Sequence, residues 1–352
     1  MILDLLTVVF VALLASALTC RLIIWFGPLD HPNIPRKQHG SATRTSGGVG
    51  IGVGYAIAMM VLLRYSAVWQ YEVNPHGARL LWTSAAFSYP LLIIGFVDDA
   101  LDLPATLKFA LYTLISFAAA LFIGPISTFP LGGDIVITIP YVVAAAGTAL
   151  WIFTLINCVN FMDGANGLAM GSVGFGLVAL ACISLAHGVP SGAAIALCGA
   201  GATLGFLVWN FPGGRLFAGD SGALFGGALA AFASLIVIIR AGVSPFVPAI
   251  VFFPLLADAL ITLAWRIWRR RSLFTGHVEH HYQLAIRGGV KREVVAVCYW
   301  AATIACGALA FFASGEPDFA AEWLALLGLI VLALTLSAFT HQWARERGLI
   351  DP

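Results

Sequence analysis

Long apolar stretches alternate with short polar segments along almost the whole chain. A helix needs about 20 mainly apolar residues to cross the roughly 30 Å hydrocarbon core of a bilayer. Stretches of about that length lie near residues 4–26, 47–63, 79–97, 105–123, 139–157, 167–187, 191–210, 221–239, 245–265, 293–312 and 321–340. The pattern predicts an all-α polytopic membrane protein with about 11 transmembrane helices, in a single domain covering residues 1–352.

The composition excludes an ordinary soluble domain. Of the 352 residues, 60% are hydrophobic and only 10% are charged, whereas soluble domains carry about 25% charged residues. The formal net charge is +1, so charge alone says little about partners. We therefore read the chain as one membrane-embedded unit that is surrounded by membrane lipids and binds no nucleic acid.

The positive charges are distributed unevenly between alternate connecting segments. Cytoplasmic loops of membrane proteins carry an excess of Lys and Arg. If the C-terminus lies in the cytoplasm, residues 27–46, 98–104, 158–166, 211–220, 266–292 and 341–352 lie there too. Among all Lys and Arg residues, only Arg64, Arg79 and Arg240 fall outside these segments and their flanks. This bias predicts the orientation of the bundle.

The connecting segments on the opposite face are short. Residues 126–129 and 134–138 flank the sequence Pro130-Leu131-Gly132-Gly133. Because Pro and Gly favour turns, this pattern predicts a small β-hairpin on the periplasmic side.

Five polar clusters occur at the predicted cytoplasmic ends of helices. They cover residues 30–48, 98–99, 157–167, 210–222 and 277–289. In the second cluster, Asp98 and Asp99 stand side by side where an apolar run ends. A charge in or beside a bilayer costs several kcal/mol unless it is solvated, paired or bound to a cation, and two adjacent carboxylates also repel each other. The pair therefore needs a cation, a proton or a basic partner, and the five clusters predict an active site at the cytoplasmic face.

Carboxylates are the first group of candidate site residues. At or near helix ends lie Asp98, Asp99, Asp163, Asp220 and Asp258. An isolated Asp often caps a helix or pairs with Arg, and Asp258, deeper in its helix, is interpreted as structural. Several carboxylates on one face instead suit Mg²⁺ or Mn²⁺, which bind one or two carboxylates together with substrate phosphates. We expect Mg²⁺ as the cofactor, with Mn²⁺ as the alternative.

Two clusters combine glycines with side chains that suit a nucleotide sugar. In residues 217–222 one Asp opens a helix among small residues; glycines allow close backbone approach, and a helix N-terminus favours phosphate. Residues 157–167 contain Asn157, Asn160 and Asn166 together with Asp163. Amides pair well with a base or with sugar hydroxyls. Both segments are therefore candidates for substrate binding.

The histidine-rich and basic segments leave more than one interpretation open. His277, His280 and His281 suggest zinc, but no His-Glu-x-x-His motif or nearby cysteine pair supports it, so phosphate binding or acid–base work is favoured. The Arg run at 266–271 either enforces topology and attracts anionic headgroups or contacts the substrate. The basic loop at 30–48 could hold a polyanion.

Together these clusters resemble the polyprenyl-phosphate N-acetylhexosamine-1-phosphate transferase family, glycosyltransferase family 4. The family's Asp-x-Pro-Asn loop with a later Arg-x-x-Gly-Gly is similar to residues 30–48. Its Asp-Asp pair followed by Leu-x-x-x-x-Lys resembles residues 98–108. Its motifs Asn-x-x-Asn-Phe-x-Asp-Gly-x-x-Gly-Leu and Phe-x-Gly-Asp-x-Gly resemble residues 157–168 and 217–222. The resemblance covers nearly the whole chain, with the motifs in the family's order.

The histidine segment departs from one branch of that family. The enzyme that makes lipid I of peptidoglycan carries three consecutive histidines, whereas this chain reads Glu-His-His at 279–281. Residues 277–283 are more similar to the His-Arg-Ser-His-x-Tyr-Gln pattern of members that initiate O-antigen chains, with Val278 and Glu279 in place of Arg and Ser. The departure bears on the sugar that is used and not on the reaction class.

The resemblance implies a reaction at the bacterial cytoplasmic (inner) membrane. An N-acetylhexosamine-1-phosphate passes from its UDP-sugar to undecaprenyl phosphate and UMP is released, which starts O-antigen or another cell-envelope polysaccharide. The expected partners are undecaprenyl phosphate and a UDP-N-acetylhexosamine carrying GlcNAc or a deoxy sugar such as FucNAc or QuiNAc; a homodimer is a possible assembly. The alternatives are phospho-N-acetylmuramoyl-pentapeptide transfer and, outside the family, an ion-coupled secondary transporter, for which the inverted repeat of many transporters is not apparent.

The resemblance also implies roles for individual residues. Metal ligation is assigned to Asp220 with Asp98 and Asp163. Catalytic roles are assigned to Asp98, Asp99, Asp163 and His280, with either Asp98 or Asp99 deprotonating or orienting the lipid phosphate. Substrate binding is assigned to Lys108, Asn157, Asn160, Asn166, His277, His281, Arg287 and Arg44.

Overall fold

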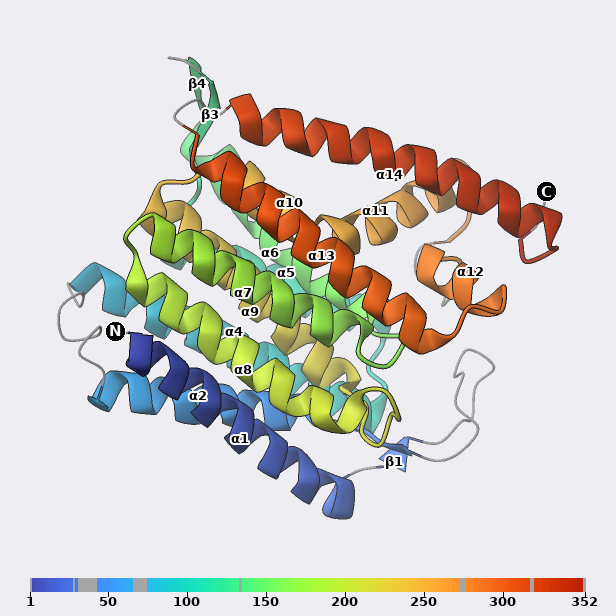
Figure 1. Cartoon of the computed structure of the whole chain (residues 1–352), viewed down its shortest axis with the longest axis horizontal. Coiled ribbons are helices and arrows are strands. Elements are labelled where there is room, and N and C mark those ends of the chain that lie inside the picture. Colours follow the sequence, from blue (N-terminus) through green and yellow to red (C-terminus); the bar gives the residue numbers. More distant parts are fainter. Residues whose placement is uncertain are drawn as a thin grey trace.

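Helices make up most of the structure, which confirms the predicted all-α polytopic fold (Figure 1). The computed structural model describes residues 2–27, 29–30, 43–65, 75–132, 135–272, 277–316 and 320–350. Within these ranges, ten helices are long and apolar enough to cross a membrane. They are α1 (Ile2–Phe26), α2 (Gly47–Tyr65), α4 (Pro75–Leu101), α5 (Ala105–Ile123), α6 (Tyr141–Met162), α7 (Leu168–Ala186), α8 (Pro190–Asn210), α9 (Gly219–Ala241), α13 (Arg292–Ser314) and α14 (Ala320–Glu346).

The span predicted at 245–265 is built from two shorter helices. α10 covers Phe246–Val251 and α11 covers Phe253–Trp268, with Phe252 between them. Pro254, in the first turn of α11, has no backbone N–H to donate to a preceding turn. It therefore begins a new helix more readily than it continues an existing one. Together, α10 and α11 still carry the chain along the bundle (Figure 1).

One end of the bundle carries the N-terminus of α1 and a small hairpin (Figure 1). Strand β3 (Thr128–Gly132) pairs antiparallel with β4 (Ile135–Thr138), which confirms the predicted hairpin. β3 continues through Pro130 with an irregular register up to Gly132. The predicted turn residues therefore belong largely to the strand.

The other end of the bundle carries the C-terminus and several short elements (Figure 1). The termini lie at opposite ends, as an odd number of crossings requires. The short elements at this end are β1 (Leu29–Asp30), β2 (Thr43–Arg44), which pairs with β1, and helix α12 (His281–Arg287).

α9 is the central helix of the bundle. It packs against α2, α4, α6, α7 and α8, and most of its side chains are buried. Helix backbones in membrane bundles approach closely at small residues. A Cβ added to Gly48 of α2 would lie 2.2 Å from the backbone nitrogen of Gly222, and one added to Gly95 of α4 would lie 2.5 Å from the carbonyl carbon of Asp220. These contacts hold the N-terminus of α9, with Asp220, against α2 and α4.

Candidate active site

The described parts of the five polar clusters converge at one end of the bundle. Residues 31–42 of the first cluster lie outside the described residues. Hydrogen bonds connect the clusters to one another: Phe217 N–H to the Arg44 carbonyl (2.9 Å), Asp220 N–H to Asp99 Oδ1 (2.8 Å), Asn160 Nδ2 to Asp220 Oδ1 (3.0 Å) and Tyr282 Oη to the Phe161 carbonyl (3.1 Å). The convergence expected from the sequence is therefore present in the structure.

Lys108 is the basic partner of the carboxylates. Its Nζ lies 2.6 Å from Asp98 Oδ2 and 3.6 Å from Asp220 Oδ2. The other oxygen of the buried Asp98 carboxylate accepts the N–H of Leu103 at 2.8 Å. A cation between two carboxylates offsets their mutual repulsion. Lys108 thus links the end of α4 to the start of α9 through charge.

Asp99 faces the start of α9. Its carboxylate accepts hydrogen bonds from the N–H of Asp220 (2.8 Å), the hydroxyl of Ser221 (3.0 Å) and the hydroxyl of Ser46 (3.2 Å). A helix N-terminus has free N–H groups and a partial positive charge, so an acceptor anion is favourable there. Consecutive helix residues point about 100° apart, and Asp98 and Asp99 accordingly have different partners.

The side chain of Asp220 is 36% exposed, whereas that of Asp98 is 2% exposed. Asn160 binds one of the oxygens of Asp220, and Lys108 lies between this carboxylate and that of Asp98. Within the described ranges, no three His, Cys, Asp or Glu side chains form a ready-made metal cage. Mg²⁺ commonly uses only one or two carboxylates and completes its shell with water and phosphates. The oxygen donors of Asp220 and Asp98 fit that chemistry.

Asp163 follows the last residue of α6, close to the other carboxylates. Burial raises its pKa well above the usual range, and the negative charges of Asp220 and Asp99 raise it further. A cation bound among the carboxylates would reverse this electrostatic effect and favour the ionised form. The ionisation of Asp163 should therefore depend on whether a cation or a phosphate is bound nearby.

The three predicted amides have different contacts. Asn160 binds Asp220, as described above, whereas Asn157 donates to the carbonyl of Phe153 in its own helix at 2.7 Å. Asn166 donates to the carbonyl of Pro212 at 3.4 Å. Asn160 is therefore the amide that lies directly against the carboxylates.

Asn210 connects the amide motif to the Gly-Asp motif, although it was not among the predicted site residues. Its side-chain oxygen accepts the N–H of Gly167 at 2.5 Å, and its nitrogen donates to the carbonyl of Leu216 at 2.8 Å. Gly167 adopts a left-handed conformation with φ +78°, which favours glycine. In the sequence, Asn210 is marked only as the first residue of the polar cluster at 210–222.

His277 and His280 lie next to the amide motif. The buried ring of His280 stacks on Phe161 with centroids 5.9 Å apart, and the ring of His277 lies 4.9 Å from that of His280. Burial lowers the pKa of His277 to about 4, and the positive charges of His280 and Arg266 act in the same direction. The imidazole of His277 is therefore neutral at pH 7.

His281 contacts α11 and α14. Its Nδ1 lies 3.2 Å from Asp258 Oδ1, and its Nε2 lies 2.8 Å from the Ser337 hydroxyl. The next residue, Tyr282, is buried and donates its hydroxyl to the Phe161 carbonyl. Both ring nitrogens of His281 thus have protein partners, and the segment is held between the end of α6 and the helices α11 and α14.

The two predicted substrate-binding arginines contact backbone carbonyls. The guanidinium of Arg44 donates to the carbonyl of Gly27. That of Arg287 donates to the carbonyls of Val278 (3.1 Å) and Leu349 (2.7 Å), which ties the histidine segment to the C-terminal residues. The structure therefore does not bring either guanidinium into a described contact with the carboxylates.

The Arg run at 266–271 divides between two surroundings. Arg266 and Arg271 form ion pairs with Glu279, and the Arg266 side chain is buried. Arg269 lies over the rings of Trp265 and Trp268, 5.6 Å and 5.5 Å from their centroids. Glu279, which departs from the family pattern, thus supplies the negative charge that pairs with the buried Arg266.

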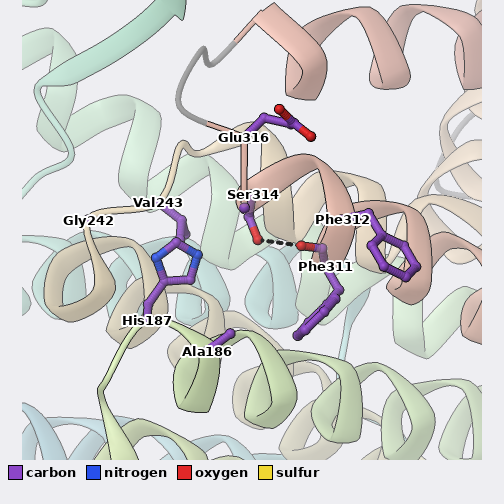
Figure 2. A pocket seen from close by; sticks show the side chains of 9 residues that line it. Ala186, His187, Gly242, Val243, Phe311, Phe312, Ser314 and Glu316 are labelled. Atoms are coloured by element: carbon purple, nitrogen blue, oxygen red, sulfur yellow. Dashed lines mark hydrogen bonds between the residues drawn. The ribbon is translucent and has the colours of Figure 1, made fainter.

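A hollow of about 620 Å³ lies at the opposite end of the bundle (Figure 2). It is formed where α7 and α13 end, whereas the candidate site lies where these helices begin. Ser314 donates to the carbonyl of Phe311 there at 3.0 Å. The lining residues are Ala186, His187, Gly242, Val243, Phe311, Phe312, Ser314, Gly315 and Glu316. None of the predicted site residues lines this hollow, so it is not part of the candidate site.

Comparison with known proteins agrees with the motifs. The model of glycosyl transferase family 4 matches residues 81–238. The decaprenyl-phosphate N-acetylglucosaminephosphotransferase of Mycobacterium leprae is 30% identical over 302 residues, covering 78% of this chain and 74% of the relative. The probable undecaprenyl-phosphate N-acetylglucosaminyl 1-phosphate transferase of Bacillus subtilis is 28% identical over 309 residues, covering 85% and 80%.

A second group of relatives is named for the transfer of a different sugar phosphate. The phospho-N-acetylmuramoyl-pentapeptide-transferase of Desulfitobacterium hafniense is 29% identical over 341 residues, covering 85% of this chain and 96% of the relative. Both groups match most of this chain at similar identity. The converging motifs and these relatives show that the chain belongs to glycosyl transferase family 4, the polyprenyl-phosphate N-acetylhexosamine-1-phosphate transferase family that its motifs resemble.

Proposed function

We propose that this protein transfers an N-acetylhexosamine-1-phosphate from a UDP-sugar to undecaprenyl phosphate and releases UMP. The observation that carries the proposal is the meeting of Asp220 with Asp98, Lys108 and Asn160, which come from separate family motifs. In the reaction, an oxygen of the lipid phosphate bonds to the phosphorus that bears the sugar. The bond from that phosphorus to the oxygen of the UMP phosphate breaks, and UMP leaves with that oxygen.

The proposed chemistry depends on bringing anionic groups together. Phosphate attacks diphosphate, so positive charge must offset the repulsion between substrates. Lys108 supplies one positive charge beside Asp98 and Asp220. Mg²⁺, held by Asp220 with Asp98 or Asp163, would supply more and would stabilise the charge that develops on departing UMP.

The carboxylate pair is given two separate roles in this proposal. The donors that contact Asp99 belong to the start of α9 and to Ser46, so we assign it to holding Asp220 in place. Asp98, whose partner Lys108 is 24% exposed, is assigned to orienting or deprotonating the lipid phosphate. Their different surroundings support this division.

The amide and histidine segments are assigned to substrate binding and orientation. Asn160 lies against Asp220 and, with Asn157, Asn166 and the neighbouring glycines, would surround the nucleotide. His280, stacked on Phe161, would face the phosphates. Arg44 and Arg287 stay candidates for the same task once the substrates are present.

GlcNAc is the first sugar to test. Two of the relatives described above are named for N-acetylglucosamine, and the histidine segment lacks the three consecutive histidines of the lipid I enzyme. Deoxy sugars such as FucNAc or QuiNAc and the muramoyl-pentapeptide donor are the other candidates. The product would begin O-antigen or another envelope polysaccharide.

We place the site at the cytoplasmic face of the bacterial inner membrane. The distribution of Lys and Arg supports this orientation, and UDP-sugars are made in the cytoplasm. Undecaprenyl phosphate would reach the site from the bilayer, with its chain among the exposed apolar helix surfaces.

The test is UMP release by purified protein with undecaprenyl phosphate, Mg²⁺ and a panel of UDP-N-acetyl sugars. We expect release that requires both lipid acceptor and metal, with one sugar preferred. Asp220→Asn is expected to lower the rate about 100-fold, the scale of losing a group that stabilises transition-state charge. Absence of release with every donor, while a control enzyme is active, would contradict the proposal, and ion-dependent flux in proteoliposomes would favour a transporter.

A further inference from the structure

A buried carboxylate on α11 takes no direct part in the proposed transfer. Asp258 is only 3% exposed. Its Oδ2 accepts the Tyr299 hydroxyl at 2.6 Å and the N–H of Tyr282 at 3.1 Å, and its Oδ1 accepts the N–H of His281 at 2.9 Å. Burying a carboxylate is costly unless several donors surround it. Asp258 therefore fixes the start of the histidine segment with strong, directed contacts.

The same carboxylate also faces two imidazole rings. Its Oδ1 lies 3.3 Å from Nδ1 of His280 and 3.2 Å from Nδ1 of His281. The His280 contact lacks the geometry of a hydrogen bond, so it acts through charge. A carboxylate beside one ring nitrogen favours a proton on that nitrogen and leaves the lone pair on the other. For His281, the Ser337 hydroxyl at 2.8 Å from Nε2 fits this tautomer, because it can donate to that lone pair.

The ring of His280 is fixed on its faces as well. It stacks on Phe161 at 26° and lies 6.0 Å from the ring of Tyr282. Phe161 belongs to the amide motif that carries Asn160 and Asp163. If the ring of His280 turned, its position relative to the substrate-binding residues of this motif would therefore change.

We propose that Asp258 is a positioning residue that holds a proton on Nδ1 of His280 and thereby leaves Nε2 as the nitrogen that meets the substrates. The same interaction sets the tautomer of His281, which anchors the segment to α14. The kinetic consequence rests on the proposed transfer, whereas the tautomer itself does not. An Asn at position 258 would keep the shape of the side chain but remove the charge that selects the Nδ1–H form.

The direct test is nitrogen NMR of protein labelled with ¹⁵N-histidine, with His280→Gln and His281→Gln used to assign the signals. In the wild-type protein, both His280 and His281 are expected to carry a proton on Nδ1. Asp258→Asn is expected to shift His280 toward a mixture of tautomers. Finding the proton of His280 on Nε2 and not on Nδ1 in the wild type would overturn the proposal, and this result does not depend on catalytic activity.

The kinetic test is a double-mutant cycle. Asp258→Asn is expected to lower kcat at least about tenfold with little change in KM, and Asp258→Glu to recover part of the loss. In a His280→Ala background, Asp258→Asn should cause no further loss, because residues that act through one another are non-additive. Thr262→Val is the matched control, since it removes an uncharged neighbour 3.3 Å from the same oxygen.

Failure of the proposed transfer and failure of the role proposed for Asp258 give different results. A wild-type protein that releases no UMP contradicts the proposed transfer, while the NMR result still decides the tautomer. Release by the wild type, with fully additive losses in Asp258→Asn and His280→Ala, would show that Asp258 does not act through His280.

Discussion

Asp98 and Asp99 are adjacent in the sequence, but the fold gives them different surroundings. Asp98 is paired with Lys108 at 2.6 Å, whereas Asp99 accepts donors from the start of α9 and from Ser46. The first arrangement is that of a charged group beside a substrate site. The second is that of an anion at a helix N-terminus, which contributes to stability.

This difference predicts separate effects of two substitutions. Asp99→Ala should lower the free energy of unfolding by about 1–3 kcal/mol, because buried donors lose their acceptor. Asp98→Asn should lower kcat much more strongly than it lowers the thermal midpoint. Thermal unfolding in detergent and UMP release from the same preparations check both expectations. Equal effects of the two substitutions on stability and rate would contradict the division of roles.

His277 predicts a pH dependence of stability. Its pKa is about 4 in the folded protein, below its ordinary value of 6.5, so the unfolded chain binds more protons between these values. Stability should therefore fall as pH drops from about 6.5 toward 4, and His277 makes no such contribution above that range. Between pH 7.5 and pH 5, the wild type should lose more thermal stability than His277→Gln. A variant that loses as much as the wild type would argue against a desolvated, neutral His277.

At the scale of elements, the position of the site depends on close helix contacts. Gly48 of α2 and Gly95 of α4 lie directly against the first turn of α9. A side chain at either position would displace the helix start that carries Asp220. The small residues of these motifs thus have a packing function in addition to any contact with substrate.

Gly48→Ala and Gly147→Ala form a matched pair that tests this contact. A Cβ at Gly48 would lie 2.2 Å from the backbone of Gly222, whereas nothing lies within 4 Å of one at Gly147 in α6. Gly48→Ala should lower both stability and activity. Gly147→Ala should be neutral or stabilising by up to about 1 kcal/mol, because Ala favours a helix. Thermal unfolding and UMP release distinguish the pair, and a harmless Gly48→Ala would refute the role given to α2.

At the scale of the whole molecule, the bundle has two distinct ends. The carboxylates, amides and histidines lie at one end, and the β3–β4 hairpin lies at the other (Figure 1). The distribution of Lys and Arg predicts that the first end faces the cytoplasm.

Single cysteines at the two ends test this orientation. Thr128 in the hairpin and Gly213 at the site end are both exposed, and T128C and G213C would be made in a background without the native cysteines. A membrane-impermeant maleimide applied to spheroplasts should label T128C, and label G213C only after permeabilisation. The opposite labelling pattern would contradict the proposed orientation.

The sequence predicted the helices well, because hydrophobic length is a strong signal in a membrane protein. It did not predict the break at Phe252, since Pro254 is compatible with either a kinked span or a new helix. It also placed Pro130 in a turn, whereas the residue continues β3. Both differences involve prolines. Because proline has no backbone N–H to donate, its effect on the backbone depends on which neighbouring donors bind the carbonyl left without a partner.

The motifs predicted which segments meet but not which atoms do. The sequence predicted that the carboxylate pair needs a cation, a proton or a basic partner, but the contact of Lys108 with both Asp98 and Asp220 depends on the relative rotation of α4, α5 and α9. Asp258 was interpreted as structural, because nothing in the sequence shows that the segment beginning at His280 folds back onto α11. Long-range pairings of this kind are properties of the fold and not of any local pattern.

The most direct measurement is detection of the lipid product by mass spectrometry after reconstitution of the purified protein with undecaprenyl phosphate, UDP-GlcNAc and Mg²⁺. We expect an undecaprenyl-diphospho-sugar that forms with UMP in equal amounts, disappears with EDTA, and is reduced about 100-fold in Asp220→Asn. Equal product from Asp220→Asn and the wild type, or product that persists without a divalent metal, would contradict the assignment of the site.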